Sequence, residues 1–197
     1  MTLALWIAAA YLLGAVPASY VAGRLKGLDL REHGSKNLGA TNVYRVLGWR
    51  SAIPVVVFDV GKGAAAVGVL GRWAEGSPWV PVILGVAAVL GHVFSPFVGF
   101  KGGKGVATAA GTFLALAPVA VLVALPVWGV CLWLTGYVSL SSIVASGTFP
   151  LWVWLTTETR PALYASVVLA VMIGYTHRTN IRRLLAGTEN RFRTRRP

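Results

Sequence analysis

Acidic residues, histidines and cysteines are scarce in this sequence. Six Asp and Glu, three His and one Cys occur among 197 residues, and no group of them has the spacing of metal ligands. We therefore expect no metal site, no bound cofactor, no disulfide framework and no mechanism built on a pair of carboxylates. The one cysteine, Cys131, lies in an apolar stretch and is interpreted as a core residue.

Two common catalytic motifs are missing as well. The sequence contains no G-x-x-x-x-G-K-[ST] phosphate loop, so nucleotide hydrolysis is not predicted. It also contains no G-x-S-x-G turn, which would place a serine nucleophile between a strand and a helix.

Apolar residues dominate the sequence. Hydrophobic residues make up 56% of the chain, charged residues 12%, and the mean hydropathy is +0.68. This composition is typical of an integral membrane protein. We predict one all-α transmembrane domain over residues 1–197, with a basic cytoplasmic tail from about residue 188. The cations lie between apolar segments and at the C-terminus, so membrane lipids rather than nucleic acid are the expected surroundings.

Apolar runs predict seven transmembrane helices. A helix of roughly 20 apolar residues crosses a bilayer. The region 106–136 is too long for one crossing and contains Pro118 and Pro126, so two shortened helices are expected there. A short span is expected at 142–155. The four remaining spans are predicted near residues 2–23, 51–71, 79–98 and 162–175.

The distribution of the 18 Lys and Arg residues orients these helices. With seven spans, Arg72 and Arg160 fall on one side, Lys62 lies inside a span, and the remaining fifteen cations share the other side. The positive-inside rule then places the N-terminus outside and the C-terminus in the cytoplasm. Four polar stretches share the cytoplasmic face, and the site is expected there: residues 34–45, 100–105, 136–142 and 176–187.

The stretch GFKGGKG combines glycines with two cations. Gly102, Gly103 and Gly105 allow backbone N–H groups to converge, and Lys101 and Lys104 stand beside the start of the next predicted helix. This pattern predicts an anion-binding loop. The alternative is a flexible basic turn near lipid headgroups.

The stretch GSKNLGATNVYR is dense in neutral polar side chains. Ser35, Asn37, Thr41 and Asn42, together with Arg45, are suited to binding an anion or a polyol. The alternative is that Ser35, Asn37 or Thr41 caps the helix that follows.

The stretch THRTNIRRLLAG supplies a possible base. His177 and Asn180 are three residues apart and share a face of a helix, with Arg182 and Arg183 nearby. Repulsion by these arginines favours a neutral imidazole that can accept a proton. The alternative is a histidine that only bonds a backbone carbonyl.

Three further polar residues lie inside predicted spans. Asp59 and Lys62, three residues apart, are expected to form an ion pair, whereas His92 is interpreted as a packing residue.

Three blocks, in this order and spacing, resemble one known family. GSKNLGATNVYR, GFKGGKGVATAAG and THRTNIRRLLAGTE are similar to those of the bacterial acyl-phosphate-dependent glycerol-3-phosphate acyltransferases, the PlsY family. The resemblance implies a seven-helix enzyme of the bacterial inner membrane with its active site facing the cytoplasm. It would transfer a fatty acyl group from acyl phosphate to the 1-hydroxyl of glycerol 3-phosphate, giving lysophosphatidic acid and phosphate for phospholipid synthesis.

The resemblance also assigns residues to the site. It implies catalytic roles for Ser35, Lys104, His177 and Asn180. Two positions depart from the family pattern, since Lys36 and Ser141 stand where the family usually has glycine. The substrate- or phosphate-binding residues that it implies are Arg45, Ser142, Lys101, Gly102, Gly103 and Gly105. The pattern of polar residues adds Asn37, Thr41, Asn42 and Arg183 to this set.

Two other functions fit parts of the pattern. A small membrane transporter of phosphate or an organophosphate would also bind an anion at interrupted helices, but the polar residues gather on one predicted side. An adaptor for anionic lipids would not need the neutral Ser, Thr and Asn set.

Overall fold

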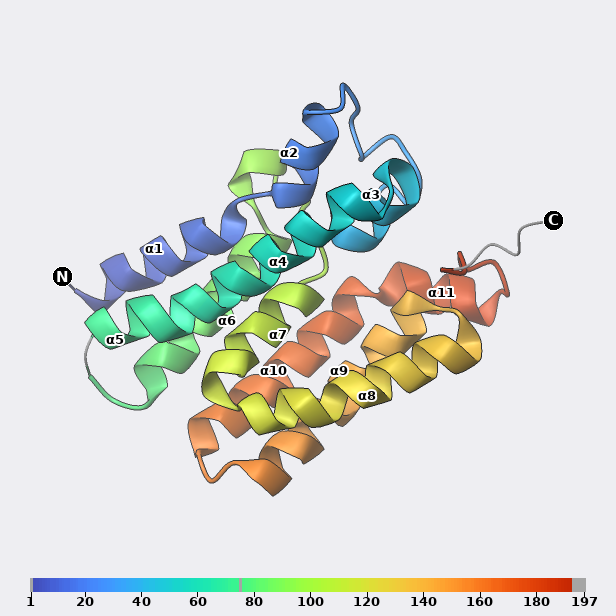
Figure 1. The fold of residues 1–197 in the computed structure, drawn as a ribbon. Coiled ribbons are helices and arrows are strands. Elements are labelled where there is room, and N and C mark those ends of the chain that lie inside the picture. Colours follow the sequence, from blue (N-terminus) through green and yellow to red (C-terminus); the bar gives the residue numbers. More distant parts are fainter. Residues whose placement is uncertain (1, 75, 193–197) are drawn as a thin grey trace. The chain divides into compact units, whose positions relative to one another are not determined.

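The computed structural model describes residues 2–74 and 76–192, and all of the regular secondary structure in these residues is helical (Figure 1). The all-α prediction is therefore confirmed. The chain divides into two compact units, Met1–Leu116 and Ala117–Pro197.

The first unit contains the helices α1 to α7. A break at Val16 and Pro17 separates the first two helices, and a π-helical turn, η1, joins α4 to α5. The bounds are α1 Leu3–Ala15, α2 Ala18–Arg24, α3 Ala40–Leu47, α4 Trp49–Ala65, η1 Ala66–Leu70, α5 Gly71–Trp73, α6 Trp79–Val93, the 3₁₀ turn η2 Pro96–Val98, and α7 Val106–Leu116.

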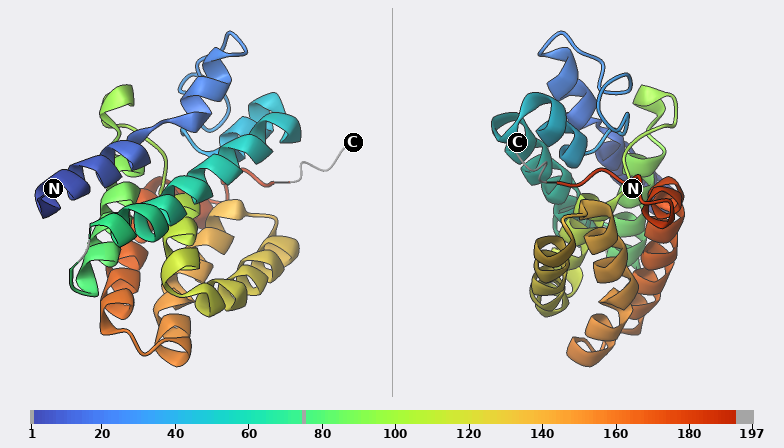
Figure 2. Two further views of the ribbon diagram at one scale, coloured as in Figure 1. Left: turned by 60° about the vertical axis from the view of Figure 1, so that its left-hand side comes forward. Right: turned by 90° about the vertical axis from the view of Figure 1, so that its right-hand side faces the viewer.

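The second unit contains three long helices and one short helix. They are α8 Pro118–Thr135, α9 Val138–Thr156, α10 Arg160–Thr176 and α11 Arg178–Leu185. Because two residues join α8 to α9 and three join α9 to α10, these helices run up and down beside one another (Figure 2). The left-handed Gly136 ends α8, with a φ angle of 75°, and allows the tight reversal.

Within the described residues, five helical segments are long and apolar enough to cross a membrane: Leu3–Arg24, Trp49–Trp73, Trp79–Val98, Pro118–Thr135 and Val138–Thr156. The apolar helices Val106–Leu116 and Arg160–Thr176 are shorter. Large apolar side chains also face outward, as in a protein surrounded by lipid. Trp133 and Leu134 are 81% and 68% exposed.

The predicted bounds need two corrections. The region 106–136 does divide into two helices, but only α7 is shortened, because Pro118 starts α8 at a position where its missing N–H costs nothing. The span expected at 142–155 begins earlier, at Val138. Ser141 stays within this helix because its hydroxyl donates to Tyr137 O at 2.9 Å.

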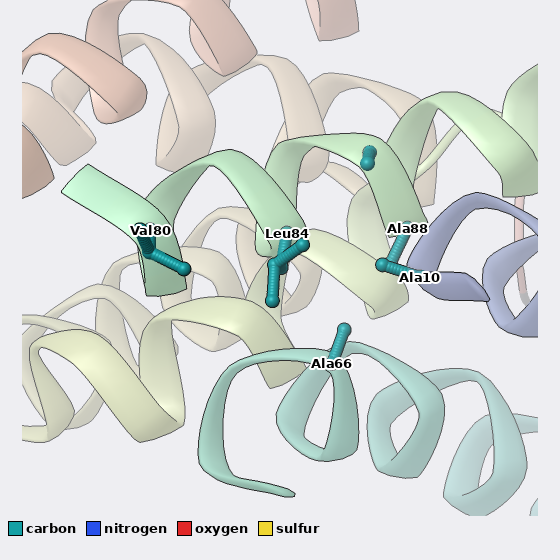
Figure 3. Packing of buried hydrophobic residues seen from close by; sticks show 6 residues of the cluster. Ala10, Ala66, Val80, Leu84 and Ala88 are labelled. Atoms are coloured by element: carbon teal, nitrogen blue, oxygen red, sulfur yellow. The ribbon is translucent and has the colours of Figure 1, made fainter. Parts of the chain in front are cut away.

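Small residues allow the helices of the first unit to approach closely. A Cβ atom at Gly14 of α1 would overlap the backbone of Ala88 in α6, and one at Gly63 of α4 would overlap the backbone of Thr108 in α7. A core of buried apolar side chains from α1, η1 and α6 lies in the same unit (Figure 3). Close helix contacts and apolar packing therefore fix α1, α4, α6 and α7 against one another.

Candidate functional site

Asn42 organises the first polar stretch. Its side chain is 1% exposed, and its Oδ1 accepts a 2.7 Å hydrogen bond from Ser35 N. Its Nδ2 donates to Leu30 O at 3.1 Å and to His33 O at 3.0 Å. Asn42 therefore holds the loop before α3 by three bonds to backbone atoms, a role that the sequence did not reveal.

The other predicted residues of this stretch remain within reach of solvent. Ser35, Asn37, Thr41 and Arg45 are all half-buried. The N-cap of α3 is Gly39, and no side chain caps this helix. The helix-capping alternative for Ser35, Asn37 and Thr41 is therefore wrong.

Lys36 lies in a backbone conformation that favours glycine. Its φ angle is 60°, in the left-handed region where a Cβ atom is strained. A glycine at position 36 would adopt this φ angle without the steric strain that the Cβ atom of the lysine causes.

The glycine loop is anchored by the end of α6. Gly102 N donates to Val93 O at 3.0 Å, and Gly103 N donates to His92 O at 3.1 Å. These carbonyls belong to the last turn of α6, whose carbonyl groups lack partners within the helix. The N–H groups of Gly102 and Gly103 therefore do not converge on a ligand, which corrects the predicted geometry of the loop.

The cations of this loop are placed differently from each other. Lys101 is exposed, whereas Lys104 is half-buried and lies directly before Gly105. Gly105 has a φ angle of 86°, and its carbonyl accepts the first helical bond of α7, from Ala109 N at 2.8 Å. An anion beside the loop would thus meet the two lysine side chains and the N-terminal end of α7.

A buried glutamate organises the polar residues of the second unit. Glu189 is 8% exposed. Its Oε1 accepts bonds from Asn180 Nδ2 at 2.7 Å and from Ser139 Oγ at 2.8 Å, and its Oε2 accepts one from Arg183 Nε at 2.6 Å. Burial raises the pKa of Glu189, but the three hydrogen bonds outweigh it, so the pKa lies below its ordinary value.

This arrangement changes the expected roles of Asn180 and Arg183. Part of each side chain is bound to Glu189, which offsets the charge of Arg183. The predicted basic tail from about residue 188 included Glu189, so its buried position was missed. The available signal was an acidic residue among the seven arginines that follow Tyr175.

The segment after Glu189 folds back on the turn between α8 and α9. Phe192 N donates to Gly136 O at 2.7 Å, and Arg191 Nε donates to Tyr137 Oη at 3.2 Å. The described part of the predicted tail is therefore packed against the second unit, whereas residues 193–197 lie outside the described residues.

His177 is buried where α10 ends and α11 begins. It is 3% exposed, and its Nδ1 lies 2.8 Å from Ile173 O. Because a carbonyl can only accept, Nδ1 carries the proton and Nε2 has the lone pair. The hydrogen bond to a backbone carbonyl, which was the alternative to a catalytic role, is therefore present. It leaves the lone pair of the neutral imidazole on Nε2, where a base requires it.

Ser142 lies inside α9 rather than in a loop. It is 5% exposed, and its Oγ accepts a 3.2 Å bond from Trp128 Nε1 of α8. The stretch 136–142 expected as a polar loop is helical from Val138 onward.

The predicted ion pair inside a span is confirmed. Lys62 Nζ lies 2.8 Å from Asp59 Oδ1, and both side chains are buried. His92, interpreted as a packing residue, has a further partner, since its Nδ1 lies 3.5 Å from the same Asp59 oxygen. Contacts between α4 and α6 are not visible in a local sequence pattern, so this network was missed.

The regular secondary structure of the described residues is helical, and five of the segments are long and apolar enough to cross a bilayer. These features place the chain in the class of integral membrane proteins. More particularly, this chain belongs to the glycerol-3-phosphate acyltransferase family, whose family model matches residues 4–187.

Individual relatives agree with this assignment. A glycerol-3-phosphate acyltransferase of Trichlorobacter lovleyi is 45% identical over 191 residues, which cover 95% of this chain and 96% of the relative. One of Geobacter sulfurreducens is 46% identical over 187 residues, covering 94% and 95%. The resemblance stated from the three sequence blocks is confirmed.

Two solved structures are similar along nearly the whole chain. Both are of PlsY (YgiH), an integral membrane glycerol 3-phosphate acyltransferase, and both are 41% identical to this chain. The glycerol 3-phosphate form has a TM-score of 0.91 and covers 98% of this chain and 96% of its own. The lysophosphatidic acid form has a TM-score of 0.86, with 96% and 94% covered. The transporter alternative finds no support among these relatives.

Proposed function

We propose that this chain transfers a fatty acyl group from acyl phosphate to the 1-hydroxyl of glycerol 3-phosphate. The observation that carries the proposal is its 41% identity and TM-score of 0.91 to an integral membrane acyltransferase solved in a glycerol 3-phosphate form. The products would be lysophosphatidic acid and phosphate, at the start of phospholipid synthesis.

The chemistry requires little beyond positioning and charge stabilisation. The hydroxyl oxygen of glycerol 3-phosphate attacks the acyl carbon, the bond from that carbon to the phosphate oxygen breaks, and phosphate leaves. Phosphate is a good leaving group, so no covalent enzyme intermediate is needed. Both substrates are anions, and cationic groups such as Arg45, Lys101 and Lys104 offset their repulsion.

We assign the catalytic roles to Ser35, Lys104, His177 and Asn180. Lys104 acts as a charge on phosphate at the start of α7, and His177 Nε2 accepts the hydroxyl proton or orients the hydroxyl. The bond from His177 Nδ1 to Ile173 O supports this role because it keeps the lone pair on Nε2. Asn42, Gly102 and Gly103 shape the two loops through hydrogen bonds to backbone atoms. The remaining predicted residues bind substrate: Arg45, Asn37, Thr41, Lys101, Gly105, Ser142 and Arg183.

We also propose seven crossings of the bacterial inner membrane, within one functional domain, with the N-terminus outside and the site at the cytoplasmic face. The five long apolar segments and the two shorter ones support this number. The 11 residues of α7 give a helix roughly 16 Å long, well below the roughly 30 Å of the hydrocarbon core. Local thinning of the bilayer around α7 completes the crossing.

Membrane-impermeant labelling of single cysteines tests this topology. Cysteines at Lys36, Gly102 and Thr188 should react only after the cells are opened. Reaction from outside intact cells would contradict the seven-span arrangement.

The function itself is tested with purified protein, acyl phosphate and radiolabelled glycerol 3-phosphate. Lipid-extractable label should accumulate, and acyl-CoA should be a poor replacement, because the cationic groups Arg45, Lys101 and Lys104 suit a bare phosphate. Efficient turnover with acyl-CoA where acyl phosphate fails would reject the assigned donor. The absence of label with either donor would reject acyl transfer.

A further inference from the structure

A buried polar network lies beneath the glycine loop of the first unit. Asp59 and Lys62 belong to α4, and His92 is the penultimate residue of α6. Their side chains are at most 9% exposed, although both helices are long and apolar enough to cross a membrane. Apolar residues of similar size would fill this space without the cost of desolvating charges. The network therefore has a role other than filling the core.

The contacts of the network lead from α4 to the end of α6. Lys62 Nζ donates to Val16 O at 3.0 Å, at the break between α1 and α2, and lies 2.8 Å from Asp59 Oδ1. The same Asp59 oxygen is 3.5 Å from His92 Nδ1. Lys62 thus fixes the carboxylate, and the carboxylate orients one edge of the imidazole ring.

The other edge of the ring faces the glycine loop. A Cβ atom at Gly103 would overlap His92 Nε2 most closely, and it would also meet the backbone oxygen of Leu38 and His92 Cε1. The backbone of His92 holds the same residue, since its carbonyl accepts the 3.1 Å bond from Gly103 N. His92 therefore touches Gly103 by both its side chain and its main chain, one residue before Lys104.

We propose that His92 is a positioning residue for the acyl transfer reaction. Asp59 and Lys62 hold its ring against Gly103, and the ring determines where the glycine loop lies and hence where Lys104 presents its charge. The consequence for rate rests on the proposed function, whereas the ordering of the loop can be measured without any substrate.

His92→Asn tests the contact directly. The side-chain amide of asparagine can place an N–H group where Nδ1 lies beside Asp59, so the ion pair keeps a polar neighbour, but asparagine lacks the ring edge that meets Gly103. Hydrogen exchange of the full-length protein in detergent, without substrate, should be about tenfold faster for the amides of residues 100–105 and unchanged in α8 to α10. The value of kcat should fall about ten- to a hundredfold, while the thermal midpoint stays near that of the wild type.

A matched control separates positioning from general loss of a buried polar group. Thr112 of α7 is fully buried, and its hydroxyl makes only a 3.5 Å bond to Gly85 O. Thr112→Val should change neither loop exchange nor kcat.

A double variant provides the second test. Gly103→Ala should cost less activity in the His92→Asn background than in the wild type, because the overlap with the ring is gone and only the one with Leu38 O remains. Hydrogen exchange of the loop at the wild-type rate in His92→Asn would overturn the proposal. The proposal would also fail if the fold-loss of kcat in the double variant equalled the product of the losses in the two single variants. If the wild-type protein transferred no acyl group, the proposed function would fail, and the exchange experiment would still decide the role of His92.

Discussion

Asn180 donates a 2.7 Å hydrogen bond to the buried carboxylate of Glu189, so a proposed catalytic side chain is held by a residue outside its own helix. The same oxygen accepts the Ser139 hydroxyl from α9, and the other oxygen binds Arg183. Glu189 therefore ties α9, α11 and the segment that follows into one polar cluster.

Replacing this carboxylate should destabilise the second unit. Glu189→Gln keeps the size of the side chain but removes the charge that binds Arg183, and it presents an NH₂ group to donors. We expect a loss of roughly 1.5 to 3 kcal/mol in the free energy of unfolding, measured by denaturation in detergent. Glu158→Gln, an exposed acid after α9, is the control and should leave stability unchanged.

The same carboxylate should make stability depend on pH. The folded-state pKa of Glu189 lies below its ordinary value of 4.5, so its contribution is complete above that value. The contribution is lost as the pH falls through the lower folded-state pKa. The thermal midpoint of the wild type should therefore drop more steeply on acidification than that of Glu189→Gln. Parallel curves for the two proteins would show that Glu189 does not supply this stability.

Lys104 and Lys101 should differ in their effect on catalysis. Lys104→Ala removes a half-buried cation beside the start of α7, and a charge-assisted contact of roughly 1.5 to 3 kcal/mol corresponds to about a ten- to hundredfold lower rate. Lys101→Ala, at an exposed position, should cost less. Steady-state kinetics with acyl phosphate and glycerol 3-phosphate measure both. A fully active Lys104→Ala variant would end the interpretation of this loop as a phosphate site.

His177 should give the reaction its dependence on pH. A base must be neutral, so activity should rise with pH if the proton acceptor is this imidazole. His177→Ala should lower kcat and flatten that rise. If the variant kept the wild-type pH profile and lost only substrate affinity, a substrate phosphate oxygen would become the preferred proton acceptor.

Lys36→Gly should stabilise the first unit. It relieves the strain of a side chain at a φ angle of 60°, and the greater freedom of glycine in the unfolded chain offsets part of that gain. We expect a net increase of about 0.5 to 1 kcal/mol, with unchanged activity. A decrease would mean that the lysine side chain makes a stabilising contact larger than the strain.

The helices were predictable because apolar runs of membrane length can hardly form anything else. The start of α9 was not, because Ser141 satisfies its hydroxyl on the carbonyl of Tyr137 and so remains inside the helix. The loop prediction for this serine rested only on its polarity.

The fine structure of the site depends on contacts between distant residues. The amides of Gly102 and Gly103 are taken by carbonyls that are available only because α6 ends at Val93. Glu189 and Ser139 are separated by 50 residues. The sequence motifs predicted which segments contribute residues to the site. The hydrogen-bond partners of those residues depend on how the helices pack, which the motifs do not contain.

Residues 189–192 contact α9, α11 and the turn between α8 and α9. These contacts determine how far the C-terminus can be shortened before the second unit loses packing. A chain that stops at Gly187 loses the carboxylate that binds Asn180 and Arg183, together with the bond from Phe192 N to Gly136 O. A chain that stops at Phe192 retains all of these contacts. Affinity tags and fusion partners therefore belong after Phe192, because a junction nearer to α11 would remove part of the packing that holds a proposed catalytic side chain in place.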